Sequence, residues 1–364
     1  MKMIRCLLGD IITFQRGYDL PRTKMEPGEY PVVGSNGIIG YHNQYTTEAP
    51  CITIGRSGNV GGPQIQFGRA WAHNTTLFVK EFKNVDPVFV YYLLLTLDLG
   101  NYAGGSAVPT LNRNHIHSLP ITIPAEIETQ KRIARILSSL DDKIEVNYQI
   151  NRNLEEQAFS FYNNLVNEAK QQCELKSVAV LNPARSLQRG SVALCIDMAQ
   201  LSTSSAYPNQ GIYKSYGGGL KFQNGDTLLA RITPCLENGK TAYIDFLKEG
   251  EIAFGSTEYI VLSSRGEMPP QFFYCLARDK RFRDYAIKHM NGSSGRQRVS
   301  ADALEKYMIP SISKEDMRLF GQNVEPLFKL MRQKADENIR LSSLRDTLLP
   351  KLMTGEIAPI KKEL

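Results

Sequence analysis

Residues 129–168 carry apolar side chains at steps that alternate between four and three, in a stretch free of Gly and Pro. This period of 3.5 residues predicts a helix that packs along a second helix rather than on a globular core. Such a helix would be about 60 Å long at 1.5 Å per residue. The predicted seam consists of Ile133, Leu137, Leu140, Ile144, Asn147, Asn151, Leu154, Ala158, Phe161 and Leu165.

A similar but less regular stripe predicts a second helix over residues 314–353, with Pro326 in its first turns or at a kink. Because a globular segment separates the two helices along the chain, we expect them to pair antiparallel. Asn147, Asn151 and Asn338 would then lie in the seam, where buried amides cost stability but fix register. The alternative is that the helices splay there and the amides are solvated. The second stripe consists of Val324, Phe328, Met331, Ala335, Asn338, Leu341, Leu344, Leu348 and Leu352.

The rest of the chain contains short apolar runs broken by turn residues, such as 51–54 before Gly55 and 226–230. These runs predict short strands of mostly β domains. The sequence therefore indicates an α+β protein with two mostly β globular domains, separated by two long helices that form an antiparallel coiled coil. The predicted boundaries are 1–124 and 172–312 for the β domains, and 125–171 and 313–364 for the helical segments.

The two halves of the chain repeat one another. A Pro-aromatic stretch, a Gly-Ser stretch, an Ile-Pro strand and a long helix occur in the same order in each half, which indicates an internal duplication with a pseudo-twofold repeat. Two pairs of landmarks share an offset of 188 residues, namely Gly104 with Gly292 and Ile121 with Ile309. The other matched stretches are 87–93 with 270–276 and, more weakly, 31–37 with 211–217.

Charge is distributed unevenly along the chain. The 43 Lys and Arg exceed the 37 Asp and Glu by six. The balance is +2 in residues 1–125 and +4 in 171–312, whereas 126–170 and 313–364 carry −2 and +2 and cancel. The positive excess therefore lies on the two β domains, which favours a polyanion as their ligand.

The six cysteines are scattered without a Cys-x-x-Cys pair, so we expect no structural zinc site and a reducing compartment. No apolar stretch approaches the roughly 20 residues of a membrane span. Residues 1–6 lack the apolar core of a signal peptide. These features predict a cytoplasmic protein without a membrane partner.

Fragments of catalytic motifs occur, but each is incomplete. Residues 86–89 (Asp-Pro-Val-Phe) approach the loop with which adenine methyltransferases hold a flipped base, yet Val replaces the second Pro, so a turn before a helix is expected. Residues 239–241 (Gly-Lys-Thr) end like a P-loop, but Pro234 stands where its first Gly is required. His115 and His117 would share one face of a strand without a third metal ligand nearby. We expect no catalytic residue, no metal site and no cofactor bound by this chain.

Cationic and amide side chains instead concentrate in Gly-rich loops of the β domains. Residues 55–62 bring Arg56 and Asn59 forward on one turn, and these residue types can bind guanine and adenine, respectively, through paired hydrogen bonds. Ordinary hairpin turns with solubilising arginines are the alternative, but the whole set favours DNA. The candidate DNA-binding residues are Arg22, Lys24, Asn36, Arg56, Ser57, Asn59, Arg69, Arg113, Lys214, Tyr216, Lys221, Arg231, Ser293, Ser294, Arg296 and Arg298.

Several stretches carry a resemblance to a known family. They are the opening Leu-Gly-Asp-Ile-Ile at 8–12, the Gly-Ser tracts late in each half, 121–124 followed by 128–133, and the closing stretch 344–357. With these stretches the chain resembles, over essentially its full length, the specificity subunits of type I restriction–modification systems. The second half departs from the pattern at 314–319 and 175–178.

This resemblance implies two target-recognition domains that each read one half of a split site in double-stranded DNA. It also implies that the helix pair measures the unread spacer and carries two methyltransferase subunits, which bind S-adenosylmethionine and methylate adenine. A restriction and translocation subunit would complete the complex. The alternatives are a coiled-coil scaffold whose lobes bind proteins, a subunit of a related type IIB or IIG-like system, and a self-contained enzyme with an unrecognised site.

Overall fold

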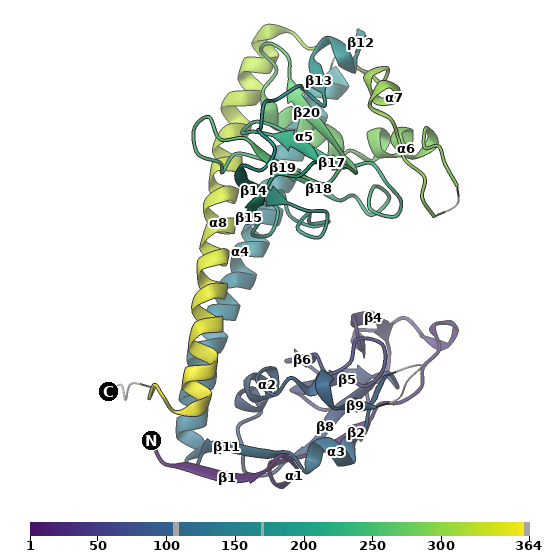
Figure 1. Cartoon of the computed structure of the whole chain (residues 1–364). Helices are drawn as coiled ribbons and strands as arrows, with labels where there is room; N and C mark the ends of the chain where they lie inside the picture. The colour runs from purple at the N-terminus through teal and green to yellow at the C-terminus, as the bar shows by residue number, and fades with distance from the viewer. Residues whose placement is uncertain (105–108, 169–170, 294, 360–364) are drawn as a thin grey trace. The chain divides into compact units, whose positions relative to one another are not determined.

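The computed structural model describes residues 1–104, 109–168, 171–293 and 295–359. The chain divides into two compact units, Met1–Asp142 with Leu341–Leu364, and Lys143–Arg340. Each unit contains one β-rich lobe and a section of each of two long helices, α4 (Ile127–Glu168) and α8 (Lys314–Thr354) (Figure 1).

The first lobe is built on an antiparallel sheet in the order β2-β8-β5-β6. A second sheet has the order β4-β3-β7, and two ladders pair β1 with β11 and β9 with β10. The strands are β1 (Met3–Leu7), β2 (Ile12–Arg16), β3 (Tyr30–Gly34), β4 (Gly37–His42), β5 (Cys51–Gly55), β6 (Pro63–Gln66), β7 (Trp71–Ala72), β8 (Thr76–Phe82), β9 (Ala103–Gly104), β10 (Thr110–Leu111) and β11 (Pro120–Pro124). The helices are α1 (Leu8–Ile11), α2 (Pro87–Leu95) and α3 (Arg113–His117), with 3-10 turns at Arg22–Lys24 and Leu99–Tyr102.

Residues 86–89 begin α2, as expected from the incomplete methyltransferase motif. The Asp86 carboxylate accepts a hydrogen bond from the Phe89 N–H at 2.8 Å, and Pro87 occupies the first helical position, where a missing N–H costs nothing. This cap aims the apolar face of α2 into the core, where Phe89, Val90 and Leu93 are buried.

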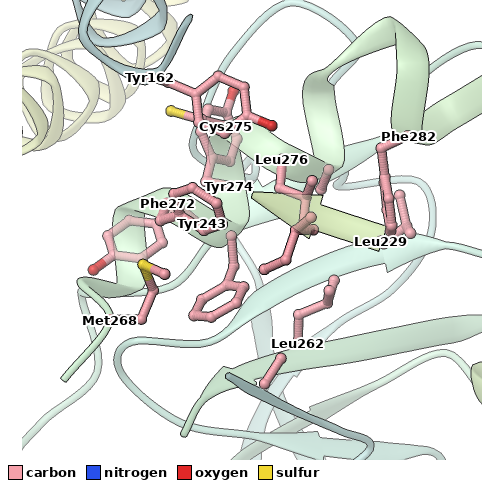
Figure 2. Packing of buried hydrophobic residues seen from close by; sticks show 14 of the residues in the cluster. Tyr162, Leu229, Tyr243, Leu262, Met268, Phe272, Tyr274, Cys275, Leu276 and Phe282 are labelled. Carbon is pink, nitrogen blue, oxygen red and sulfur yellow. The ribbon is translucent and has the colours of Figure 1, made fainter. Parts of the chain in front are cut away.

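The second lobe has two four-stranded sheets, β13-β20-β17-β18 and β15-β14-β19-β16, and a ladder of β12 with β21. The strands are β12 (Gln172–Glu174), β13 (Ala179–Leu181), β14 (Val192–Ile196), β15 (Ile212–Ser215), β16 (Leu220–Phe222), β17 (Thr227–Ala230), β18 (Thr241–Tyr243), β19 (Ala253–Gly255), β20 (Tyr259–Ser264) and β21 (Met308–Pro310). The helices are α5 (Pro270–Arg278), α6 (Lys280–Lys288) and α7 (Ala301–Glu305), with a 3-10 turn at Leu175–Ser177. Helix α5 packs its aromatic residues on β17 and β20 (Figure 2).

The order of elements recurs between the lobes, which supports the predicted repeat. Strands β8 and β20 begin 183 residues apart, and so do helices α2 and α5. Helices α3 and α7 begin 188 residues apart, the offset seen in the sequence. One predicted match between the halves is wrong. The sequence matched residues 31–37 with 211–217, which places β3 opposite β15. The parallel partners show that β3, which pairs with β7, corresponds to β14, which pairs with β19.

The two long helices run antiparallel within each unit. In the first unit, Asp141 of α4 accepts a hydrogen bond from Arg345 of α8 at 2.7 Å, and Leu137 shares a buried cluster with Leu352. In the second unit, the Asn151 amide donates to the Met331 carbonyl oxygen at 3.2 Å. Residues further along α4 therefore contact residues earlier in α8, as expected for antiparallel helices. Buried positions of the predicted stripes are Ile133, Leu137, Asn147, Asn151, Leu154, Ala158, Val324, Phe328, Met331, Asn338 and Leu352, and partly buried ones are Leu140, Ile144, Leu165, Ala335, Leu341 and Leu348.

The predicted seam is wrong at Phe161, which is 38% exposed, and at Leu344, which is 47% exposed. Beyond Leu154 the buried positions of α4 advance by four, through Ala158 to Tyr162 and Val166, because this part of the helix packs on the second lobe as well as on α8. Figure 2 shows Tyr162 at the edge of the core formed by α5. At Leu344 the next residue, Arg345, faces α4 instead.

A tyrosine–carboxylate bond ties each lobe to α4. In the first unit the Tyr92 hydroxyl donates to Asp141 at 2.5 Å, and in the second the Tyr274 hydroxyl donates to Glu155 at 2.6 Å. Gln130 adds a backbone link, because its amide donates to the Pro124 carbonyl oxygen and accepts from the Asp86 N–H. The lobes are therefore fixed to the helix by buried polar contacts as well as by apolar packing.

The seam amides pair directly with each other. Asn147 is fully buried and donates to the Asn338 Oδ1 at 2.9 Å, while Asn338 donates to the Ile144 carbonyl oxygen at 3.3 Å. This geometry favours register fixing over the solvated alternative.

We predict that Asn338→Leu lowers the free energy of unfolding by about 1–3 kcal/mol, because it removes one of the two acceptors of the buried Asn147 amide, the other being the Glu337 carboxylate, and the donor to the Ile144 carbonyl oxygen. The double variant Asn147→Leu/Asn338→Leu should recover most of that loss, since both polar groups are then replaced by apolar ones. Denaturant unfolding of the four proteins of this cycle measures the coupling. Strictly additive losses would contradict a register-fixing pair.

In the second unit the Asp245 carboxyl group lies beside Tyr207, whose hydroxyl also donates to the Phe328 carbonyl oxygen of α8 at 2.8 Å. Burial raises the pKa of Asp245 to about 6, against the opposing effects of the Tyr207 hydroxyl, which donates to it at 2.9 Å, and of Arg332. The folded state therefore holds a proton that the unfolded chain releases near pH 4, so this group costs stability as the pH rises from about 4 through 6.

We predict that Asp245→Asn stabilises the protein by about 1–2 kcal/mol at pH 7.5, and that this gain disappears as the pH falls towards 4. Asn keeps an acceptor for Tyr207, and Arg332 keeps its ion pair with Asp336. Thermal unfolding across this pH range is the measurement, with Asp142→Asn, at an exposed position of α4, as control. A gain that is equal at all pH values would contradict the raised pKa.

Candidate nucleic-acid interface

The loop after β5 is fixed by backbone contacts. The Arg56 N–H donates to the Thr75 carbonyl oxygen at 2.8 Å, and the Arg56 carbonyl oxygen accepts from the Leu111 N–H at 2.9 Å. Gly55 lies so close to the loop that a Cβ there would be 1.7 Å from the Asn59 carbonyl oxygen. These constraints place Arg56 at the end of the central sheet, and Ser57 and Asn59 on the loop beside it.

Three arginines meet at this strand end. Arg16 at the end of β2, Arg56 after β5 and Arg113 at the start of α3 line a pocket of about 380 Å³ with Thr110 and Asn112. Burial and the nearby charge of Arg16 lower the pKa of the Arg56 guanidinium. No side chain that lines the pocket carries a negative charge.

The β3–β4 turn lies next to this loop. The Ser35 N–H donates to the Thr75 hydroxyl at 3.3 Å, and the Ser35 hydroxyl oxygen is 3.2 Å from the position of a Cβ on Gly58. Asn36, at the tip of the turn, is exposed. The structure thus brings Asn36, Arg56, Ser57, Asn59 and Arg113 of the predicted set together in the first lobe.

The second lobe repeats this construction around Arg231. The Arg231 N–H donates to the Glu258 carbonyl oxygen, and its carbonyl oxygen accepts from the Val299 N–H, both at 3.0 Å. Glu258 directly precedes β20 as Thr75 directly precedes β8, so Arg231 is the counterpart of Arg56. Here the Glu258 carboxylate binds the Arg298 guanidinium at 2.8 Å, and this hydrogen bond, with the charges of Arg298 and Arg231, lowers the pKa of Glu258.

Other predicted residues of the second lobe lie on or beside the β15-β14-β19-β16 sheet, or on the turn between Asn291 and Arg298. Lys221 lies 5.7 Å from the ring of Tyr216, and Lys214 forms an ion pair with Asp197 at 2.9 Å. Ser293 and Arg296 are exposed on the turn that leads to Arg298, whereas Ser294 lies outside the described residues.

The remaining predicted residues of the first lobe are elsewhere. Arg22 and Lys24 are exposed on a 3-10 turn, and no hydrogen bond between described residues joins their side chains to the loop after β5. Arg69 is held by an ion pair with Glu48 at 2.8 Å and lies over the Tyr45 ring. Among the described residues, no hydrogen bond or ion pair connects any of these three side chains to that loop.

Sequence reasoning missed Arg16 and Glu258, although both are central to the two clusters. Arg16 ends an alternating strand and Glu258 precedes a buried one, so neither lies in a Gly-rich loop. The repeat could have indicated Glu258, had β8 and β20 been aligned at the offset of 183 residues.

His115 and His117 do not lie on a strand as predicted. They lie in α3, which Asn112 caps by accepting a hydrogen bond from the Asn114 N–H, and His117 Nε2 accepts from the Phe14 N–H at 2.9 Å. The described residues contain no group of three or more His, Cys, Asp or Glu side chains placed to hold a metal ion. No helix in the described part of the chain has the length and hydropathy needed to cross a membrane.

The sequence and the fold were both compared with those of known proteins, and the matches name the same family. Residues 6–156 match the model of the type I restriction modification DNA specificity domain. The crystal structure of the S subunit of a type I restriction–modification system from M. genitalium superposes with a TM-score of 0.64 at 16% identity. That alignment covers 97% of this chain and 96% of that one, and it shows a common fold.

Curated relatives agree with this match. The EcoprrI specificity subunit of Escherichia coli is 29% identical over 143 residues, which cover 38% of this chain and 35% of that protein. The MjaIX specificity subunit of Methanocaldococcus jannaschii is 23% identical over 341 residues, which cover 79% of this chain and 74% of that protein. The chain therefore spans about a third of the first relative and about three quarters of the second. Residues 6–156 therefore carry a type I restriction–modification specificity domain, and the chain is similar to type I specificity subunits over about three quarters of its length.

Proposed function

We propose that this chain is the DNA-reading subunit of a type I restriction–modification complex, with each lobe contacting one half of a split target. The observation that carries this proposal is the repeated placement of arginines at equivalent strand ends, Arg56 in the first lobe and Arg231 in the second. Guanidinium groups on backbone-anchored loops suit contacts to phosphates and base edges. The net positive charge of the two lobes points to the same ligand.

Catalysis in this proposal belongs to partner subunits. Two methyltransferase subunits bind S-adenosylmethionine and methylate adenine, and restriction subunits cleave, while this chain binds no cofactor. The exposed faces of α4 and α8 are the proposed platform for the methyltransferases. Their length is the proposed measure of the unread spacer between half-sites.

The competing function is a scaffold whose lobes bind proteins. An acidic protein partner would also bind arginine-bearing loops, and one experiment distinguishes the two functions. The full chain is co-expressed with its methyltransferase, and methylated adenines are mapped across a host genome. DNA recognition gives methylation at a two-part motif, together with duplex binding that weakens with salt. A scaffold gives neither.

We predict that Arg231→Ala weakens binding of the target duplex by about 1–3 kcal/mol and relaxes only the half-site read by the second lobe. The control is Arg265→Ala, which removes the same charge from an exposed position at the other end of β20. Binding to duplexes with single base changes is the measurement. Relaxed specificity in both half-sites, or an equal effect of the control, would contradict separate reading by the lobes.

We predict that a longer helix pair lengthens the spacer. One heptad inserted after Asn151 in α4, with another before its partner Met331 in α8, adds about 10 Å to each helix. At 3.4 Å per base step this corresponds to about three base pairs. The methylation motif should keep its bases and gain that spacing. An unchanged spacer would contradict the measuring role.

A further inference from the structure

The arginine pocket of the first lobe contains a charge imbalance. Arg16, Arg56 and Arg113 share one pocket with two neutral polar residues, and burial and the charge of Arg16 lower the pKa of the Arg56 guanidinium. Within the described residues, no hydrogen bond or ion pair engages any of these three guanidinium groups. Like charges brought together without a counter-charge cost folding energy, which a bound anion would offset.

At the equivalent position of the second lobe, a carboxylate of the protein itself balances the positive charge of the arginines. There Arg231 and Arg298 flank the Glu258 carboxylate, and Arg298 binds it through both Nε and a terminal nitrogen at 2.8–3.0 Å. In the first lobe the residue that precedes the neighbouring strand is Thr75 instead of a glutamate. The fold therefore accommodates a carboxylate here, and the first lobe lacks one.

The pocket also offers neutral donors. The Asn112 Oδ1 is occupied by the Asn114 N–H at 3.0 Å, so its amide nitrogen remains to donate, and the Thr110 hydroxyl lies on the same lining. The lining therefore offers several hydrogen-bond donors and no carboxylate. Such a lining suits a negatively charged ligand that only accepts hydrogen bonds.

We propose that the Arg16–Arg56–Arg113 pocket binds one backbone phosphate of the DNA, so that Arg56 positions the duplex instead of reading a base. This inference rests on the proposed function. A guanine edge is neutral and is satisfied by one bidentate arginine, whereas a phosphate has oxygens for two guanidinium groups at once. The phosphate replaces the counter-charge that Glu258 provides in the second lobe.

The test neutralises single phosphates. The full chain is bound to a series of target duplexes, each with one methylphosphonate linkage, which removes one negative charge and leaves the bases unchanged. Wild-type protein should lose about 10-fold in affinity at one linkage in the first half-site. The double variant Arg16→Ala/Arg56→Ala should bind the unmodified duplex more weakly and should show no further loss at that linkage. Its plot of log affinity against log salt should be less steep by about one.

Two more variants separate the possible outcomes. Arg16→Lys/Arg56→Lys keeps the charge without the bidentate fork, so it should retain sensitivity to the same linkage. Lys83→Ala, at the far end of β8 from Thr75, should leave the response to each linkage unchanged. Thermal unfolding confirms that each variant is folded.

Two results would overturn the pocket proposal. One is an alanine variant with the same linkage profile as wild type. The other is a double alanine variant that tolerates any base at one target position but keeps its salt dependence, which would make these arginines base readers. Both results still leave specific duplex binding by wild-type protein, whereas failure of the proposed function would remove that binding from every protein in the series.

Discussion

Two backbone hydrogen bonds at the end of the central strand organise each lobe of this protein. In the first lobe they join Arg56 to Thr75 and Leu111, and in the second they join Arg231 to Glu258 and Val299. Because main-chain groups make these bonds, the position of the arginine is set by strand pairing and survives large changes in the loops around it. A lobe can thus change the residues near its arginine without losing the arginine's position.

The two lobes use this common position with different electrostatics. The second lobe balances Arg231 and Arg298 with a carboxylate, which holds the Arg298 guanidinium in one orientation. The first lobe gathers three arginines with no carboxylate in the lining. Under the proposed function the two halves contact different DNA sequences, so these sites would diverge while the helices and strand ladders keep the repeated fold.

The sequence predicted the large features because they depend on long periodic patterns. Both long helices and their antiparallel pairing follow from the apolar stripes, and buried Asn147 and Asn338 pair as expected for register-fixing amides. The prediction failed at Phe161, where α4 changes from one packing partner to two and the spacing of buried residues changes with it. The weak match of 31–37 to 211–217 failed because neighbouring strands of a hairpin have similar compositions. Arg16 and Glu258 were missed because their importance arises from contacts between strands distant in sequence, which no local pattern records.

Hydroxyl-radical footprinting of a target duplex with the full chain tests most directly whether two lobes read one split site. The account predicts two protected segments separated by an accessible spacer. It also predicts that Arg231→Ala weakens protection of one segment and leaves the other intact. A single continuous footprint, or loss of both segments together in that variant, would contradict recognition by two separate lobes.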